Sequence, residues 1–150
     1  MSLKICKILI MKIEKQVCTL EQAKELFELQ IDAAPFFMWH IGGVTGEWII
    51  IDTVHSNITT QDFPAFTSAE LGMMLLVEDD LHFTQTHYNE HFGEWQTLVL
   101  RRPKDEDVVA FDNIYTGEGD TESESKCDAL IWMLKNGITS KGNILESLQG

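Results

Sequence analysis

Regularly spaced apolar residues predict two amphipathic helices, one near each end of the chain. The first is expected to begin after Thr19, because the T-x-x-Q pattern from Thr19 to Gln22 is typical of a capping box. The residues expected on its apolar face are Leu20, Ala23, Leu26, Phe27 and Ile31. Pro35 prevents continuation, because it lacks an amide donor and disfavours helical geometry at Ala34.

The second amphipathic helix is expected from about Thr121 to Asn136, with Gly137 as its C-cap. Its apolar face is formed by Cys127, Leu130, Ile131 and Leu134. A short middle helix is expected to end at Leu75, because residues 67–70 repeat the capping-box pattern. Residues 3–13 are apolar with lysines interspersed, and they fit a strand and a helix equally well.

Runs of aromatic and β-branched residues predict antiparallel strands. Residues 36–41 and 47–52 flank the glycines of 42–46, which is typical of a hairpin. Further strands are expected at 81–87 and 94–102, joined by a turn at 89–93, and at 108–112. Residues 53–63 and 116–124 are polar and are expected to form loops.

The length and composition favour one folded domain. The chain has 150 residues, of which 44% are hydrophobic, and no Gly/Ser-rich or Pro-rich linker divides it. We therefore expect a single-domain α+β fold over residues 1–138. It would contain a mainly antiparallel sheet of about five strands, packed by the N-terminal helix, the C-terminal helix and the short middle helix. Residues 139–150 are expected to form a polar, flexible C-terminal tail.

The charges are distributed unevenly along the chain. The formal net charge is −13, yet residues 1–24 carry five lysines against two glutamates. Residues 25–100 contain twelve acidic side chains and no lysine or arginine. Binding to phosphate backbones requires several cations on one face, so direct nucleic-acid binding is not expected. An acidic surface is compatible with simple solubility, with a basic protein partner, or with an acidic mimic of nucleic acid that acts as a decoy.

The sequence also bears on the compartment. Cys6, Cys18 and Cys127 are odd in number and lack C-x-x-C spacing, so we expect reduced thiols rather than a disulfide framework. The most apolar stretch, residues 3–13, is interrupted by three lysines and is far shorter than the ~18 residues of a membrane span. No export signal is recognised. A cytoplasmic protein without membrane association is the expectation.

The histidine-rich run from His82 to His91 is the best candidate metal site. Imidazole and carboxylate groups can bind zinc, provided that three or four of them converge on one ion. The candidate ligands are His82, His87 and His91. If the run is a strand and a turn, however, His82 and His87 lie on opposite faces, since five residues is an odd step. The expectation is therefore no bound metal and no cofactor, with a small metal-dependent hydrolase as the alternative.

Other candidate residues favour packing or partner contacts over catalysis. Cys127 lies among acidic residues, which disfavour a thiolate, so a buried thiol is expected. The acidic groups at 78–80 and 105–107 are expected in solvated turns, and the glycines of 42–46 lack the helix of a phosphate-binding loop. Trp39 and Trp48 lie on the two arms of the predicted hairpin, as a cross-strand pair or a stacking platform. The candidate partner-facing residues are Glu78, Asp79, Asp80, Trp39 and Trp48.

Three segments together resemble a family of small proteins encoded by phages and prophages, whose function is unknown. These are CTLEQAKELFELQI (18–31), AFTSAELGMML (65–75) and TESESKCDALIWMLKNGI (121–138). They cover about a third of the chain and consist of helix caps and apolar faces. The chain departs from the family pattern at Leu76, where proline is expected, and in its longer C-terminal tail. The resemblance implies an origin in a mobile element and a cytoplasmic setting, and it transfers no catalytic residue.

The expected function is that of a non-enzymatic phage or prophage accessory protein that acts through contacts with another protein. The identity of that partner is left open, and a basic protein is one alternative that the acidic middle of the chain allows. The sequence leaves the oligomeric state open, including a homo-oligomer.

Overall fold

The computed structural model describes residues 12–31, 33–54, 58–59, 61–77, 79–103 and 110–144. In chain order the elements are η1 (Ile13–Lys15), α2 (Leu20–Glu28), β1 (Phe37–Ile41), β2 (Trp48–Asp52), β3 (Phe63–Pro64), α3 (Ser68–Met74), β4 (His82–Asn89), β5 (Glu94–Arg101), β6 (Asp112–Gly119) and α4 (Glu122–Lys135). The segment 3–13, for which the sequence fits a strand and a helix equally well, lies outside the described residues up to residue 11. The element η1 begins at Ile13.

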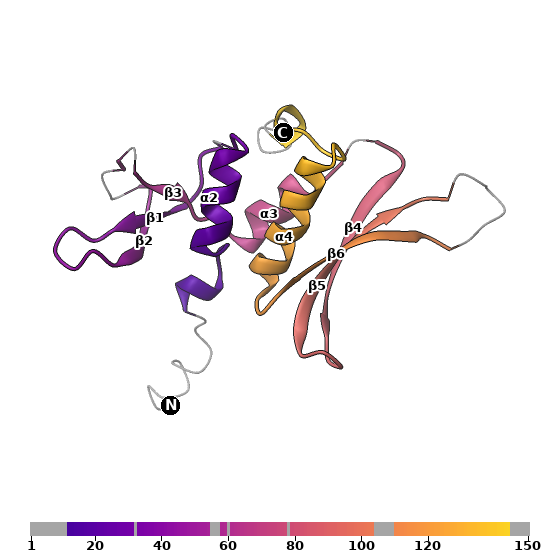
Figure 1. The fold of residues 1–150 in the computed structure, drawn as a ribbon, viewed down its shortest axis with the longest axis horizontal. Helices are drawn as coiled ribbons and strands as arrows, with labels where there is room; N and C mark the ends of the chain where they lie inside the picture. The colour runs from indigo at the N-terminus through magenta and orange to yellow at the C-terminus, as the bar shows by residue number, and fades with distance from the viewer. Residues whose placement is uncertain are drawn as a thin grey trace.

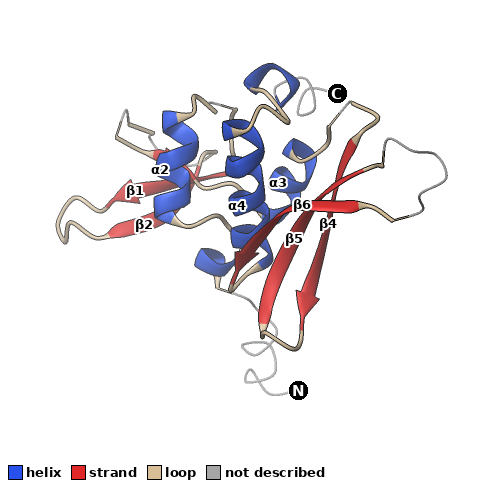
Figure 2. Ribbon diagram, turned by 45° about the vertical axis from the view of Figure 1, so that its right-hand side comes forward, coloured by secondary structure: helices blue, strands red, loops and turns tan. Residues whose placement is uncertain are grey.

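The strands form two separate antiparallel sheets. The small sheet has the order β2-β1-β3 and the large sheet has the order β4-β5-β6. Helices α2, α3 and α4 lie between them, with the small sheet at the left and the large sheet at the right in Figure 1, and Figure 2 shows the same separation. The α+β prediction is confirmed. The prediction of one sheet with about five strands is wrong, because six strands divide into two sheets that pack on different helices.

Both capping boxes predicted for the N-terminal and middle helices are present. The hydroxyl of Thr19 accepts a hydrogen bond from the amide of Gln22, whose side chain accepts one from the amide of Thr19. Thr67 and Glu70 make the same reciprocal pair at the start of α3. Each box satisfies two amides that a helix start leaves without partners, so local sequence alone determines where α2 and α3 begin.

The last strand differs from its prediction. The sequence predicts a strand at 108–112 and a polar loop at 116–124, but β6 extends from Asp112 to Gly119, and residues 108 and 109 lie outside the described residues. Polar residues and two glycines interrupt the apolar pattern by which a strand is usually predicted. A Cβ added at Gly117 would lie 2.5 Å from the carbonyl oxygen of Ser125, and one added at Gly119 would lie 2.4 Å from the Cβ of Glu124. These glycines let the strand approach α4 more closely than any other residue would allow.

The core lies where the helix layer meets both sheets. Its buried members include Leu26 of α2, Leu71 of α3, Val99 of β5 and Leu130 of α4, and residues of the small sheet pack against their edge. Three expectations fail at the margin of this core, the first being Leu20 at the start of α2, which is only partly buried. Phe27 is 50% exposed, because α2 buries mainly Ala23 and Leu26. Leu134 of α4 is only partly buried.

The start of the expected C-terminal tail packs against the core. Residues 141–144 form a helical turn, Ile144 is fully buried, and Gly137 takes the positive φ of a helix C-cap. Residues 145–150 lie outside the described residues. Within the described ranges, no helix combines the length and the apolar character that crossing a bilayer requires.

Candidate functional site

The β1–β2 hairpin projects from the helices as the outermost part of the small sheet (Figure 1). Its turn is closed by hydrogen bonds from the amide of Gly42 to the carbonyl of Glu47 (2.8 Å) and from the amide of Gly46 to the carbonyl of Gly42 (2.9 Å). Gly46 has a φ of +67°, a backbone conformation that L side chains rarely adopt. The predicted hairpin is confirmed, with Trp39 opposite Ile50 and Ile41 opposite Trp48.

The hydrogen-bond pattern of the small sheet determines which backbone groups of β2 point away from it. The amide of Thr53 donates to the carbonyl of Phe36 (3.0 Å), and Glu47 is bonded to Gly42. The direction of the backbone N–H and C=O groups alternates from residue to residue along an antiparallel strand. The odd-numbered residues of β2 therefore form hydrogen bonds with β1. The N–H and C=O groups of Trp48 and Ile50 therefore point outward, where the described residues place no further strand.

Apolar side chains surround this free edge on both faces of the sheet. Trp48 and Ile50 share one face with Trp39, while Ile49 and Ile51 lie on the other. Ile49 is 46% exposed, and Val44 at the tip of the hairpin is fully exposed. Edge strands are commonly protected by lysine, proline or a bulge, and β2 has none of these.

The two hairpin tryptophans lie on the same face but do not pair directly. Trp39 donates from its indole nitrogen to the carbonyl of Cys18 at 3.1 Å, which ties the sheet to the body of the protein. The ring of Trp48 is tilted against Phe63 at 5.7 Å, and Lys24 of α2 lies 5.4 Å from the centre of the Trp48 ring. Trp39 and Trp48 are therefore not a directly opposed cross-strand pair, because Trp39 lies opposite Ile50 and Trp48 lies opposite Ile41.

A buried aspartate and a histidine tie the loop before β3 to the other face of the sheet. His40 Nδ1 lies 2.7 Å from Asp62 Oδ1, and the amide of Thr59 donates to Asp62 Oδ2 at 2.9 Å. Burial of the Asp62 side chain opposes ionisation, but the hydrogen bonds from Thr59 and His40 outweigh it. The pKa of Asp62 therefore lies below its ordinary value of 3.8. No local sequence pattern reveals this pair, because 22 residues separate its members.

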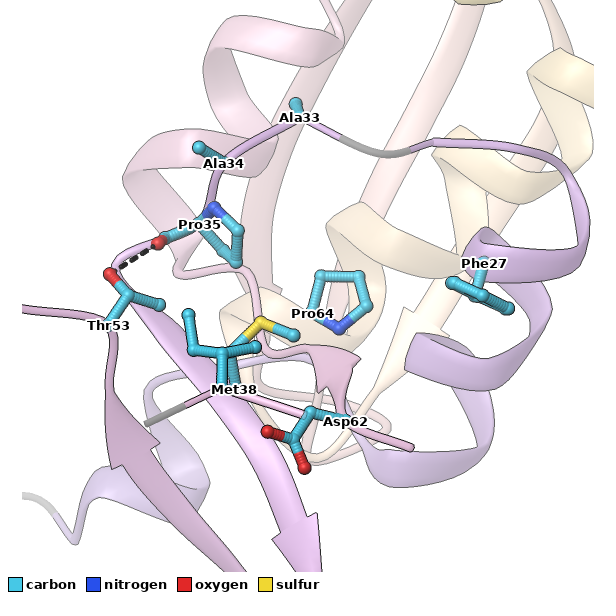
Figure 3. Close-up of a pocket in the computed structure, with 9 residues that line it drawn as sticks. Phe27, Ala33, Ala34, Pro35, Met38, Thr53, Asp62 and Pro64 are labelled. Carbon is cyan, nitrogen blue, oxygen red and sulfur yellow. Dashed lines mark hydrogen bonds between the residues drawn. The ribbon is translucent and has the colours of Figure 1, made fainter. Parts of the chain in front are cut away.

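A small cavity lies beside Asp62, between the small sheet and the segment after α2 (Figure 3). Its volume is about 250 Å³, and most of its lining is apolar, including Phe27, Pro35, Met38 and Pro64. One polar group at its wall, the hydroxyl of Thr53, donates to the carbonyl of Pro35 at 3.0 Å. With Asp62 and Thr53 both bonded within the protein, the cavity presents mainly apolar surface.

Acidification is expected to release the stabilisation that Asp62 provides. A carboxyl group whose pKa is lowered by folding stabilises the folded state above its ordinary pKa, and this contribution is lost as the pH falls through the lowered pKa. We expect the free energy of unfolding to fall less steeply below about pH 4 in Asp62→Asn than in the unaltered protein. Urea unfolding at several pH values measures this slope. The exposed Asp80→Asn serves as the matched control, and equal slopes in all three proteins would contradict the assignment.

A second cavity lies between α2, β6 and α4, with a volume of about 210 Å³. The rings of Tyr115 and Trp132 stack at 4.7 Å, and the Tyr115 hydroxyl donates to Asp128 at 2.8 Å. Burial and the Asp128 hydrogen bond raise the pKa of Tyr115 to about 12. Lys135 pairs with Glu25 across the mouth. Two pairs of polar groups in its lining are therefore bonded within the protein, Tyr115 with Asp128 and Lys135 with Glu25.

The histidine run forms strand β4 and the turn that follows it. Strand alternation places His82 and His87 on opposite faces, and His91 lies in the turn against the ring of Phe92. The carboxylate of Asp79 lies beside the first of these histidines, with its Oδ2 2.8 Å from His82 Nδ1. Among the described residues, no group of three His, Cys, Asp or Glu side chains could hold a metal ion.

The purified protein is expected to carry no stoichiometric metal. The reason is the divergent orientation of His82, His87 and His91 along β4 and its turn. Elemental analysis of untagged, dialysed protein is the appropriate measurement. About one zinc per chain that disappears in His87→Ala, but remains in Gln85→Ala, would overturn this expectation and favour a hydrolase.

The remaining candidates are the acidic residues near β4 and the buried cysteine of α4. Asp79 caps the turn before β4, accepting hydrogen bonds from the amides of Leu81 (3.0 Å) and His82 (2.7 Å), while Asp80 is exposed. Glu78, His55 and residues 105–107 lie outside the described residues. Cys127 is fully buried beside Cys18, and this burial raises the pKa of its thiol. A buried neutral thiol is a poor nucleophile.

A comparison of the chain with protein-family models, curated proteins and solved structures found no match.

Proposed function

We propose that the protein is non-enzymatic and acts by binding another protein through the small sheet β2-β1-β3, as an accessory protein of phage or prophage type in the cytoplasm. The observation that supports this most directly is the free edge of β2. There the N–H and C=O groups of Trp48 and Ile50 point outward between apolar side chains. An unprotected edge is a template for pairing with another chain, and natural proteins usually block edges that have no partner.

The large sheet offers a weaker surface for such a partner. One of its faces is covered by α4, which contacts β6 closely at Gly117 and Gly119. The opposite face carries polar side chains in the middle of its strands. Among them are Gln85, which lies opposite Leu98, and His87, which lies opposite Gln96. By contrast, β2 presents three consecutive isoleucines, of which Ile49 is exposed and the other two are partly exposed. Exposed apolar surface of this kind favours a protein contact.

Site-specific photocrosslinking in cells that express the protein tests the proposal. A photoreactive amino acid at Val44 or Ile49 would report on the small sheet, and one at Phe92, which is 67% exposed in the β4–β5 turn, is the matched control. We expect a defined heteromeric product from positions 44 and 49 only. The identified partner, once purified, should bind the unaltered protein and lose most of its affinity for Ile49→Lys.

Crosslinks that form only from position 92 would contradict the proposal, as would a partner that binds Ile49→Lys as tightly as the unaltered protein. Ile49 is nearly half exposed, so its replacement is expected to leave the fold intact. The melting temperature of Ile49→Lys should therefore be measured alongside binding.

A further inference from the structure

We infer that the partner inserts one uncharged aromatic side chain, a phenyl or an indole ring, into the cavity beside Asp62 (Figure 3). This inference rests on the proposed function, because the cavity belongs to the same small sheet and its occupant defines the chemistry of the partner. Three features lead to it: the size of the cavity, the chemistry of its lining and its position next to β2.

The cavity has the size of a single ring. Its volume is about 250 Å³. An apolar cavity of about 150 Å³ holds one benzene molecule, so this one has room for a phenyl or indole group together with the methylene that carries it. Clefts that take drug-sized molecules are larger, at about 300–1,000 Å³. One side chain therefore fits the available space better than a larger ligand.

The polar groups in the lining are already bonded within the protein. Asp62 Oδ2 accepts from the amide of Thr59 (2.9 Å), and Asp62 Oδ1 accepts from the Thr59 hydroxyl (3.2 Å) and lies 2.7 Å from His40 Nδ1. The Thr53 hydroxyl donates to the carbonyl of Pro35 at 3.0 Å. A polar side chain in the cavity would lose its hydrogen bonds to water beside groups that already have partners, which is unfavourable. The negative charge of Asp62 disfavours an acidic side chain in particular.

The apolar groups in the lining favour a ring over an aliphatic chain. Phe27 contributes an aromatic ring that is half exposed, Met38 contributes a thioether, and Pro35 and Pro64 supply further apolar walls. Contacts between aromatic rings, and between sulfur and a ring, stabilise beyond the burial of apolar area alone. An aromatic side chain would gain both kinds of contact in this cavity.

The cavity adjoins the strand that carries the proposed contact. Thr53 follows directly after β2 and lines the cavity. Met38, which also lines it, lies opposite Ile51, so the cavity and the exposed side chain of Ile49 belong to the same face of the small sheet. Protein interfaces commonly depend on a few aromatic side chains that fill pockets near their centre. A partner that covers Ile49 would meet such a pocket beside it.

The ring has to come from another molecule. None of the residues outside the described ranges is Phe, Tyr or Trp, so those parts of the chain do not supply it. A second copy would offer the exposed rings of Phe92 or Phe111. Each copy carries a formal net charge of −13, however, and this charge disfavours self-association. We therefore assign the ring to a different protein.

Titration of the isotope-labelled full-length protein with N-acetyl-phenylalaninamide tests the cavity itself by nuclear magnetic resonance. We expect saturable shifts of the amide signals of Met38 and Thr53, half complete at about millimolar concentration, since one ring supplies the contacts. N-acetyl-leucinamide should bind more weakly, and the amide of N-acetyl-glutamate should not bind. The amide of Phe92 in the β4–β5 turn is the internal reference. Unchanged signals at Met38 and Thr53 would overturn the inference.

Selection from a displayed library of random decapeptides tests whether a protein segment supplies the ring. The immobilised full-length protein is the target, and Ala34→Leu is used to remove peptides that bind elsewhere. Ala34 lines the cavity and is exposed, so a larger side chain there obstructs the cavity without entering the core. We expect the enriched peptides to share one Phe or Trp.

Affinities of one enriched peptide, measured by fluorescence anisotropy, then identify the contacts. Ala34→Leu should weaken binding about fivefold or more, whereas Ala110→Leu, at an exposed position before β6, should leave it unchanged. Phe27→Ala removes a half-exposed ring from the wall and should weaken binding about two- to tenfold, with Phe92→Ala as its matched control. The melting temperature of each variant shows whether its fold is intact.

The outcomes separate this inference from the proposed function. Peptides that lack an aromatic residue, or that bind Ala34→Leu and Phe27→Ala undiminished, yet are lost with Ile49→Lys, would overturn the inference and leave the small sheet as a binding surface. Binding of N-acetyl-phenylalaninamide without any cavity-dependent peptide would overturn it by assigning the cavity to a free small molecule. A dimer in sedimentation experiments that Ala34→Leu dissociates would overturn it by placing a second copy there. Failure to enrich any peptide that depends on the cavity or on Ile49 would count against both.

Discussion

Replacing Leu130 by alanine is expected to lower the free energy of unfolding by about 2–5 kcal/mol, the range for removing a large buried side chain. Leu130 is fully buried in α4, at the point where the helix layer joins β5 and β6. Urea unfolding followed by circular dichroism provides the measurement. The matched control is Leu134→Ala on the same helix, which removes the same atoms from a partly buried site and should cost less. A Leu130→Ala protein as stable as the unaltered one would contradict the placement of α4 in the core.

Replacing Gly117 by alanine is expected to destabilise the protein by about 1–3 kcal/mol or more, as overpacking does. An added Cβ would lie 2.5 Å from the carbonyl oxygen of Ser125 and 2.7 Å from the amide nitrogen of Ala129. Both atoms belong to the backbone of α4, which cannot yield as a flexible side chain would, so strand and helix would have to separate. Thermal and urea unfolding measure the effect.

Gly43→Ala is the control for this substitution. Nothing lies within 4 Å of a Cβ at Gly43, and its φ is not positive, so its replacement should change stability little. Equal melting temperatures for the two variants would show that β6 and α4 are not in close contact.

Local signals in the sequence predicted the elements whose stabilising contacts are themselves local. The capping boxes at Thr19 and Thr67 and the glycine turn of the β1–β2 hairpin each depend on residues within a few positions of one another. The pattern does not reveal β6, because this strand is held by pairing with β5 and by close packing against α4, which require glycine at Gly117 and Gly119. Apolar patterning therefore could not reveal it.

The division into two sheets could not be predicted, because it depends on which distant strands pair. β3 has only two residues and pairs with β1, which leaves β2 at the edge. The sequence predicted β2 as a strand, but its free edge follows from the sheet order alone. For the same reason the His40–Asp62 pair left no recognisable pattern in the sequence.

The separation of the two sheets has a consequence for how the molecule opens. The large sheet and α4 come from one stretch of the chain, from His82 to Lys135. The small sheet is attached to the rest by hydrogen bonds, such as those from the Trp39 indole to the carbonyl of Cys18 and from the Cys18 amide to the carbonyl of Phe66. Cooperative units of this kind can open at different free energies. Amide protons of β1 and β2 should therefore exchange with solvent through a local opening that leaves the large sheet closed. A partner bound at β2 would slow amide exchange in the small sheet, and the exchange rates in the large sheet and α4 would stay unchanged.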